Sequence, residues 1–182
     1  MTQLYGVAGL PLSGKTTVAG KMQQNGFKKV DMGDVVREEM DKRGVPAEET
    51  GDFVSALRKQ NGMAAIAELT LPYVEEVLQE NEKVVISGMR SWMEKECFEK
   101  NLSEQLNIIA VWASRETRFE RQEGRGREED QVVKLEERDE REIEHGAAKL
   151  ITLADYLLVN EFDSLEGFEQ EVENALQELE VK

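Results

Sequence analysis

The sequence predicts an α/β fold in three layers, with a five-stranded parallel sheet between two layers of helices. Short apolar runs alternate along the chain with longer segments of helical periodicity, which is typical of parallel strands joined by crossover helices. The apolar run at 83–87 shows no polar alternation, which indicates a strand buried on both faces. The 182 residues suffice for one domain with a substantial core. We therefore expect a single domain over 1–182.

A glycine-rich loop follows the first predicted strand. Residues 9–16 fit the pattern G-x-x-x-x-G-K-[ST] of a phosphate-binding loop, in which backbone N–H groups converge on phosphate oxygens at a helix N-terminus. Lys15 is expected to contact the β and γ phosphates as a catalytic residue, and Thr16 to bind Mg²⁺ through its hydroxyl. The residues expected to bind the nucleotide here are Gly9, Leu10, Pro11, Leu12, Ser13, Gly14, Lys15, Thr16 and Thr17. The loop predicts ATP and Mg²⁺ as ligands.

The second predicted strand, at 27–31, leads into a helix for which Asp34 is the expected N-cap. Residues 46–81 have helical character almost throughout, which is more helix than a single crossover requires. We interpret residues 34–82 as a helical insertion that forms a small lobe over the acceptor substrate.

Three further strands are predicted at 83–87, 106–113 and 155–159. The chain closes with an amphipathic helix whose apolar positions should face the core, namely Leu165, Phe168, Val172, Leu176 and Leu179. Because ligands bind at the carboxyl ends of parallel strands, the candidate chemistry should gather along one edge of the sheet.

Five arginines stand out in this acidic chain: Arg115, Arg118, Arg121, Arg125 and Arg127. Ion pairs with nearby Glu on a solvated helix are one interpretation. Arg125 and Arg127 each lie beside a glycine, which favours a lid at 115–130 that closes on phosphates. Arg37 and Arg90 follow two strands in glycine-containing turns, and planar guanidinium groups suit phosphate oxygens there. A second, phosphorylated substrate is therefore expected.

Composition excludes several classes of protein. The formal charge of −15 argues against nonspecific nucleic-acid binding. With Cys97 as the only cysteine, neither an intrachain disulfide nor a cysteine-based zinc site can form, and His145, the only histidine, is expected on the surface. Arg138 and Arg141, flanked by acidic residues, are interpreted as helix-surface ion pairs. No apolar run is long enough to span a bilayer, so a cytoplasmic protein without membrane contact is expected.

These segments together resemble the nucleoside monophosphate kinases, and most closely the archaeal P-loop ATPases related to adenylate kinase and dephospho-CoA kinase. The resemblance is carried by residues 9–16, 33–37, 87–90, the arginine-rich segment and 154–160. It implies a three-layer P-loop NTPase fold with a helical acceptor lobe and an Arg-rich lid. It further implies acceptor contacts from Gly33, Asp34, Arg37 and Arg90, lid residues Arg118, Arg121, Arg125 and Arg127, and a nucleotide site that includes Arg118 and Asn160.

The sequence departs from the related kinases at more than one position, and one departure is that no proline precedes Arg90. Ser87 stands where their strand ends in an Asp that orients magnesium-bound water, so either Asp31 or Asp34 compensates or catalysis is slow. The predicted activity is transfer of the γ-phosphate of Mg-ATP to a small phosphorylated acceptor, with a nucleoside monophosphate preferred. Transfer to the ribose hydroxyl of dephospho-CoA, with Asp31 as base, is one alternative. The other is a nucleotide-dependent switch or ATPase with a protein partner, which Ser87 favours.

Overall fold

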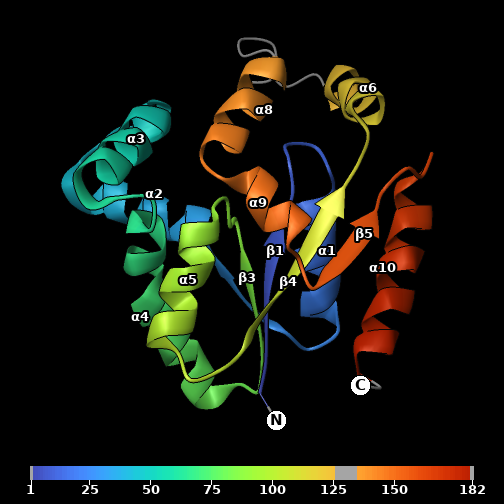
Figure 1. The fold of residues 1–182 in the computed structure, drawn as a ribbon, viewed down its shortest axis with the longest axis horizontal. Helices are drawn as coiled ribbons and strands as arrows, with labels where there is room; N and C mark the ends of the chain where they lie inside the picture. The colour runs from blue at the N-terminus through green and yellow to red at the C-terminus, as the bar shows by residue number, and fades with distance from the viewer. Residues whose placement is uncertain (1, 126–134, 181–182) are drawn as a thin grey trace.

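The computed structural model describes residues 2–125 and 135–180. Five parallel strands form one sheet in the order β2-β3-β1-β4-β5, which places the first strand at its centre (Figure 1). The strands are β1 (Gln3–Ala8), β2 (Lys28–Asp31), β3 (Lys83–Ser87), β4 (Leu106–Trp112) and β5 (Tyr156–Val159). The predicted α/β fold with a five-stranded parallel sheet is confirmed.

Helices cover both faces of the sheet (Figure 1). One face carries α1 (Lys15–Gln24) and α10 (Leu165–Glu180). The other face carries α2 (Met32–Arg43), α4 (Ala65–Glu80), α5 (Trp92–Asn101) and α9 (Ala147–Thr152). The remaining helical segments are a 3₁₀ turn (Ala47–Glu49), α3 (Thr50–Asn61), α6 (Arg115–Arg125) and α8 (Leu135–Glu144).

The central strand shows why the strands lack polar alternation. Successive side chains of a strand point to opposite faces of the sheet. In β1, Leu4 and Ala8 are buried in the cluster beneath α2, α4 and α5, whereas Tyr5 and Val7 are buried in the cluster beneath α1 and α10. Because both faces are covered, both sets of positions must be apolar.

The closing helix α10 packs on the sheet largely as its periodicity predicts. Phe168, Val172 and Leu176 are buried in one cluster with residues of α1, and Leu179 is partly buried against them. The prediction for Leu165 was wrong, because this first residue of the helix is 64% exposed. The apolar stripe reaches the sheet only from the second turn onward.

The N-cap of α2 lies three residues before the predicted one. Asp31 ends β2 in an extended conformation, and its Oδ1 accepts hydrogen bonds from the N–H groups of Gly33 at 2.9 Å and Asp34 at 3.3 Å. The carboxylate of Asp31 therefore caps the helix. The expectation that Asp34 is the N-cap was wrong, and Asp34 lies in the first turn instead.

Helix α3 stands out from the sheet in the segment predicted as the acceptor lobe. It packs on α2, α4 and the 3₁₀ turn, and its buried residues are Leu57 and Arg58. Its neighbour α4 lies on the sheet and contributes buried Ala67 and Val74 to the core. The boundaries 34–82 stay a prediction. None of the helices in the described ranges is both long and apolar enough to cross a membrane.

Candidate nucleotide and acceptor site

The loop between β1 and α1 needs glycine at two positions. Gly9 has a φ of 153° and Gly14 a φ of 110°, in the region that side chains with a Cβ rarely adopt. A Cβ on Gly9 would lie 2.4 Å from the carbonyl oxygen of Val111, and one on Gly14 would lie 2.5 Å from Nδ2 of Asn160. The backbone therefore passes close to β4 and to the end of β5, which fixes the path of the loop.

Lys15 lies over the loop that precedes it. Its Nζ donates hydrogen bonds to the carbonyl oxygens of Gly9 and Leu10, both at 2.8 Å. The pKa of Lys15 is lowered to about 7, chiefly by burial and also by the nearby cations Arg90, Arg138 and Arg118, with Asp139 opposing the shift. A bound anion would offset this concentration of positive charge.

The start of α1 fits a magnesium nucleotide. Gly14 is the N-cap and supplies no side-chain hydrogen bond, so no capping side chain occupies the helix N-terminus where a phosphate would bind. Thr16, in the first turn, is exposed. The Ser13 hydroxyl is buried and has no hydrogen-bond partner among the described residues. Within the described ranges no group of three His, Cys, Asp or Glu could hold a metal. The role of Thr16 as a Mg²⁺ ligand rests on the phosphate-loop motif and stays a prediction.

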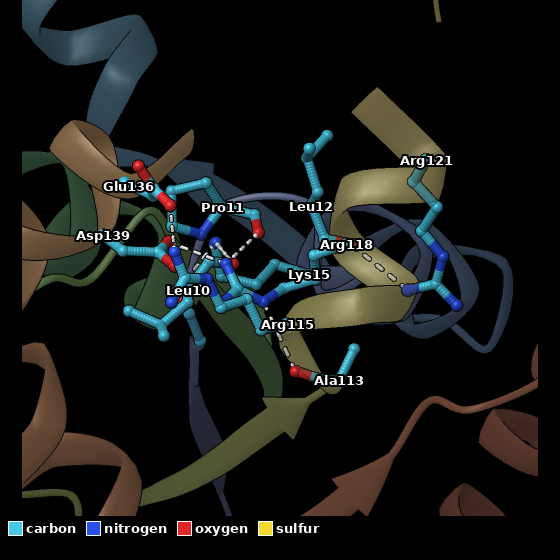
Figure 2. Close-up of polar contacts among 11 residues, drawn as sticks. Leu10, Pro11, Leu12, Lys15, Ala113, Arg115, Arg118, Arg121, Glu136 and Asp139 are labelled. Carbon is cyan, nitrogen blue, oxygen red and sulfur yellow. Dashed lines mark hydrogen bonds and ion pairs between the residues drawn. The ribbon is translucent and has the colours of Figure 1, made fainter. Parts of the chain in front are cut away.

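Arg118 of α6 connects the loop to α8 (Figure 2). Its guanidinium donates two hydrogen bonds of 2.7 Å to the two oxygens of Asp139, and donates to the carbonyls of Pro11 at 3.2 Å and Ala113 at 3.3 Å. The residue is only 4% exposed. Arg118 thus lies against the predicted nucleotide loop, although its contact with a nucleotide stays a prediction.

Arg121 and Asn160 hold the far side of the loop. Arg121 donates to the carbonyl of Leu12 at 3.2 Å and to Oδ1 of Asn160 at 2.9 Å. The side-chain amide of Asn160, which is 3% exposed, donates to the carbonyl of Ser13 at 2.8 Å. The end of β5 is therefore fastened to the loop, and Asn160 has a structural task besides its predicted role at the nucleotide.

The predicted lid is described in part. Arg115 begins α6 and pairs with Glu136 of α8 (Figure 2). The side chain of Arg125 and the whole of Arg127 lie outside the described residues. Their assignment to a lid at 115–130 stays a prediction.

The ends of β2 and β3 lie next to each other, and three of the four predicted acceptor residues follow β2 directly. Asp31 and Ser87 are register partners, and the Ser87 hydroxyl donates to Oδ2 of Asp31 at 2.7 Å. A Cβ on Gly33 would lie 3.3 Å from Nη1 of Arg37, so this guanidinium, which pairs with Asp34, folds back toward the strand end. Asp31 thus lies beside Ser87, as required if it compensates for the missing Asp.

Arg90 reaches across to α8. It pairs with Glu142, and its backbone N–H donates to Oε2 of Glu94 at 2.6 Å. Glu142 therefore pairs with the predicted acceptor residue, and Asp139 pairs with Arg118. Other elements thus supply the partners of these two carboxylates, and the interpretation of Arg138 and Arg141 as helix-surface ion pairs stays a prediction.

The sequence reasoning missed a buried group of three residues. Arg58 of α3 donates from Nη2 to Oε1 of Glu94 at 3.2 Å, and its Nη1 lies 2.8 Å from Nδ1 of His145. His145 was expected on the surface, and the structure shows it half-buried against this arginine. The pattern from Ser91 to Glu94 is a capping box, and this signal could have located Glu94 in advance. Nothing in the local sequence indicates Arg58.

Similarity to known proteins extends over most of the chain. A family model described as an AAA domain matches residues 6–145. The UPF0200 protein of Thermococcus sibiricus is 40% identical over 181 residues, which cover 97% of this chain and 95% of that protein. The UPF0200/UPF0201 protein of Archaeoglobus fulgidus is 38% identical over 175 residues, which cover 94% of this chain but only 54% of that protein.

Solved structures share the fold at low sequence identity. A shikimate kinase from Bacteroides thetaiotaomicron has a TM-score of 0.63 at 17% identity, with 98% of both chains covered. A dephospho-CoA kinase from Campylobacter jejuni has a TM-score of 0.62 at 16% identity, again over 98% of both chains. These likenesses show a P-loop kinase-like fold.

Proposed function

The chain belongs to the UPF0200 family, and from that membership and its P-loop kinase-like fold we propose that it is a phosphotransferase. It moves the γ-phosphate of Mg-ATP to a small phosphorylated acceptor, with a nucleoside monophosphate as the first candidate. One observation carries this proposal: a complete phosphate loop and the paired ends of β2 and β3, with Arg37 and Arg90, lie along one edge of the sheet. We expect the reaction to take place in the cytoplasm.

Each side of the site has its own task. The loop N–H groups and Lys15 bind the phosphates of ATP, and Thr16 binds Mg²⁺. Bound Mg-ATP supplies the phosphoryl group that is transferred. Arg118 and Asn160 flank the nucleotide, and the lid arginines, Arg125 and Arg127, close over the transferring group. The acceptor is held by Gly33, Asp34, Arg37 and Arg90.

The protein contributes positioning and charge rather than covalent chemistry. Phosphoryl transfer develops charge on the equatorial oxygens, and the cations around Lys15 would stabilise such charge. Asp31 holds the Ser87 hydroxyl and caps α2, so its carboxylate is fixed at the acceptor end. A carboxylate there could orient a water molecule or accept a proton from an attacking hydroxyl.

The deciding experiment follows γ-phosphate from Mg-ATP and separates the products by chromatography. The acceptors are AMP, CMP, UMP, GMP, dephospho-CoA and shikimate, the last because a structural neighbour is a shikimate kinase. Transfer to one monophosphate supports the proposal, and transfer to dephospho-CoA supports the ribose-hydroxyl alternative with Asp31 as base. Bound ATP without transfer to any acceptor contradicts a phosphotransferase.

Variants assign the two halves of the site. Lys15→Ala should abolish transfer, because the charge that contacts the β and γ phosphates is lost. Arg37→Ala should raise the acceptor KM and leave the KM for ATP in place. An unchanged acceptor KM would remove Arg37 from its role. Steady-state kinetics with each substrate varied in turn measures both effects.

A second function is favoured by the Archaeoglobus fulgidus relative. Only 54% of that protein matches this chain, and its name joins UPF0200 with UPF0201. We therefore keep as the second candidate a nucleotide-dependent switch whose partner is a separate UPF0201 protein. Copurification of the two proteins with ATP, with ADP and without nucleotide tests it. Association that does not depend on the nucleotide would contradict a switch.

A further inference from the structure

Arg58 is a buried cation with an unused donor. It lies on α3, in the predicted acceptor lobe, and is 7% exposed. A guanidinium carries five N–H donors and is costly to bury unless they are paired. The contacts of Arg58 are with Glu94 at 3.2 Å and His145 at 2.8 Å, and its Nε has no hydrogen-bond partner in the described part of the chain. The guanidinium has capacity for a further acceptor.

Glu94, the carboxylate that Arg58 contacts, also has other tasks. Oε2 of Glu94 accepts the backbone N–H groups of Arg90 at 2.6 Å and Ser91 at 3.1 Å, and Glu94 forms a capping box at the start of α5. Only Oε1 contacts Arg58. The negative charge of Glu94 is therefore shared with a helix N-terminus, and it offsets the charge of Arg58 only in part.

Arg58 and Arg90 lie side by side. Both contact Glu94, one with its side chain and the other with its backbone. Both also meet the end of α8, where Glu142 pairs with Arg90 and His145 contacts Arg58 three residues later. Each position is thus fixed twice, by α5 and by α8.

Arg90 continues this arrangement toward the phosphate loop. The charge of Arg58 helps to lower the pKa of Arg90, and the charge of Arg90 helps to lower the pKa of Lys15, so each pair is close enough to repel. We call Lys15, Arg90 and Arg58 the cationic row. It runs from the loop that binds the triphosphate to α3.

We propose that Arg58 is an acceptor-binding residue, whose guanidinium binds an oxyanion group of the acceptor at the end of the cationic row away from the phosphate loop. Its role as an acceptor contact rests on the proposed function, whereas the oxyanion site itself does not. Planar guanidinium groups bind phosphate and carboxylate oxygens with two parallel hydrogen bonds. A brace between helices alone would explain neither a buried Nε without a partner among the described residues nor a second arginine beside it.

The site can be tested without turnover through His145. As the only histidine, its imidazole gives a single set of NMR signals, and its Nδ1 lies 2.8 Å from Arg58. The probe is inorganic phosphate, titrated into a Lys15→Ala background that removes phosphate binding at the loop. We expect a saturable shift of the His145 signals, because an anion on Arg58 offsets the charge that the ring senses.

Three variants decide the outcome. Arg58→Met should weaken the phosphate affinity about tenfold to a hundredfold, as expected for loss of hydrogen bonds from a charged group. Arg58→Lys keeps the charge but loses the planar guanidinium with its parallel donors. Its phosphate affinity should lie between those of Arg58→Met and the parent. Lys59→Met, the matched control on the exposed side of α3, should bind as the parent does. Thermal unfolding of each variant identifies any that fails to fold.

Two results would overturn the oxyanion site: a folded Arg58→Lys or Arg58→Met protein that keeps the parent affinity, or a parent whose His145 signals show no saturable shift. The transfer assay then separates the two levels of the proposal. If phosphate binds at Arg58 but no acceptor is phosphorylated, the proposed function fails and the site stands. If transfer occurs and Arg58→Lys leaves the acceptor KM unchanged, the acceptor role of Arg58 fails alone.

Discussion

At the scale of single residues, burial and nearby charges shift the pKa values of Glu94 and His145, the two residues that contact Arg58. Burial raises the pKa of Glu94, against the opposing effects of the Arg90 N–H and the Arg58 guanidinium. Burial lowers the pKa of His145, and Arg58, Arg90 and Arg141 lower it further. Because Arg58 can only donate, Nδ1 of His145 must accept, and the neutral ring carries its proton on Nε2.

We expect an NMR titration of His145 to give a pKa below its usual value of 6.5, since protonation would place a second cation against Arg58. Arg58→Met should move this pKa upward toward 6.5, whereas Lys59→Met should leave it in place. A His145 pKa at or above 6.5 in the unchanged protein would show that the contact does not form in solution.

The same shift makes stability depend on pH. The unfolded chain binds a proton at position 145 more readily than the folded chain, so the free energy of unfolding should fall as the pH drops below about 6.5. His145→Gln, whose amide oxygen can accept from Arg58, should lack this part of the loss. Urea unfolding at about pH 7.5 and about pH 5.5 measures the loss of unfolding free energy in each protein. The carboxylates contribute equally to this loss in the parent and in the variant, so the difference between the proteins reports His145.

At the scale of elements, the loop and α1 are held from three directions. Asn160 at the end of β5 donates to the carbonyl of Ser13, Arg121 of α6 donates to that of Leu12, and Arg118 donates to that of Pro11. The loop conformation therefore depends on contacts with elements that follow it by more than one hundred residues. These three contacts use carbonyl oxygens of the loop and none of its N–H groups.

Two glycines near the start of α1 should respond in opposite ways to alanine. At Gly14 a Cβ would lie 2.5 Å from Asn160 Nδ2 and 2.8 Å from a ring carbon of Phe168, at a φ of 110°. Gly14→Ala should therefore cost at least about 2 kcal/mol of unfolding free energy and weaken Mg-ATP binding. At Gly20, inside the helix, nothing lies within 4 Å. Gly20→Ala should stabilise by about 0.5–1 kcal/mol and leave binding unchanged.

Chemical denaturation and calorimetric titration with Mg-ATP measure both glycine variants. Loss of nucleotide affinity in Gly20→Ala would indicate a general effect of substitutions in α1. Wild-type affinity in Gly14→Ala would contradict the tight fit between the loop and Asn160.

At the scale of the whole molecule, an acidic chain encloses a cationic site. The formal net charge is −15, yet Arg90, Arg118 and Arg138 lie close enough to Lys15 to help depress its pKa. Like charges spread over a surface repel one another and oppose folding, whereas a cleft of one sign attracts ligands of the other. Salt screens both effects.

Added salt should therefore have opposite effects on folding and on binding. Between about 20 mM and about 0.5 M NaCl we expect the midpoint of thermal unfolding to rise and the Kd for Mg-ATP to increase. Adenosine, which carries no phosphate, is the matched ligand, and any binding of it should change little. Nucleotide affinity that rises with salt would contradict an electrostatic site.

The fold and the phosphate loop could be predicted because their causes are local. The boundaries of β3 were predicted to the residue, since a continuous apolar run needs only a strand that is buried on both faces. Gly9 and Gly14 could be assigned to a tight turn because their backbone freedom belongs to the residue type. The predicted N-cap of α2 was wrong, but it lay only three residues after the true one.

The partners of the charged residues were decided by the tertiary structure alone. Arg58 meets Glu94 across 36 positions and His145 across 87, and Arg118 meets Asp139 across a gap of 21. Within a short segment, any of these charges could equally form a solvated pair with a neighbour on its own helix. Which partner is chosen depends on which helices converge at the carboxyl edge of the sheet and on how much water they exclude there. The sequence by itself determined the sheet and the place of the phosphate loop, because strand burial and glycine geometry act within a few residues. The burial and pairing of Arg58 required the assembled fold, because desolvation is a property of the surroundings and not of the residue.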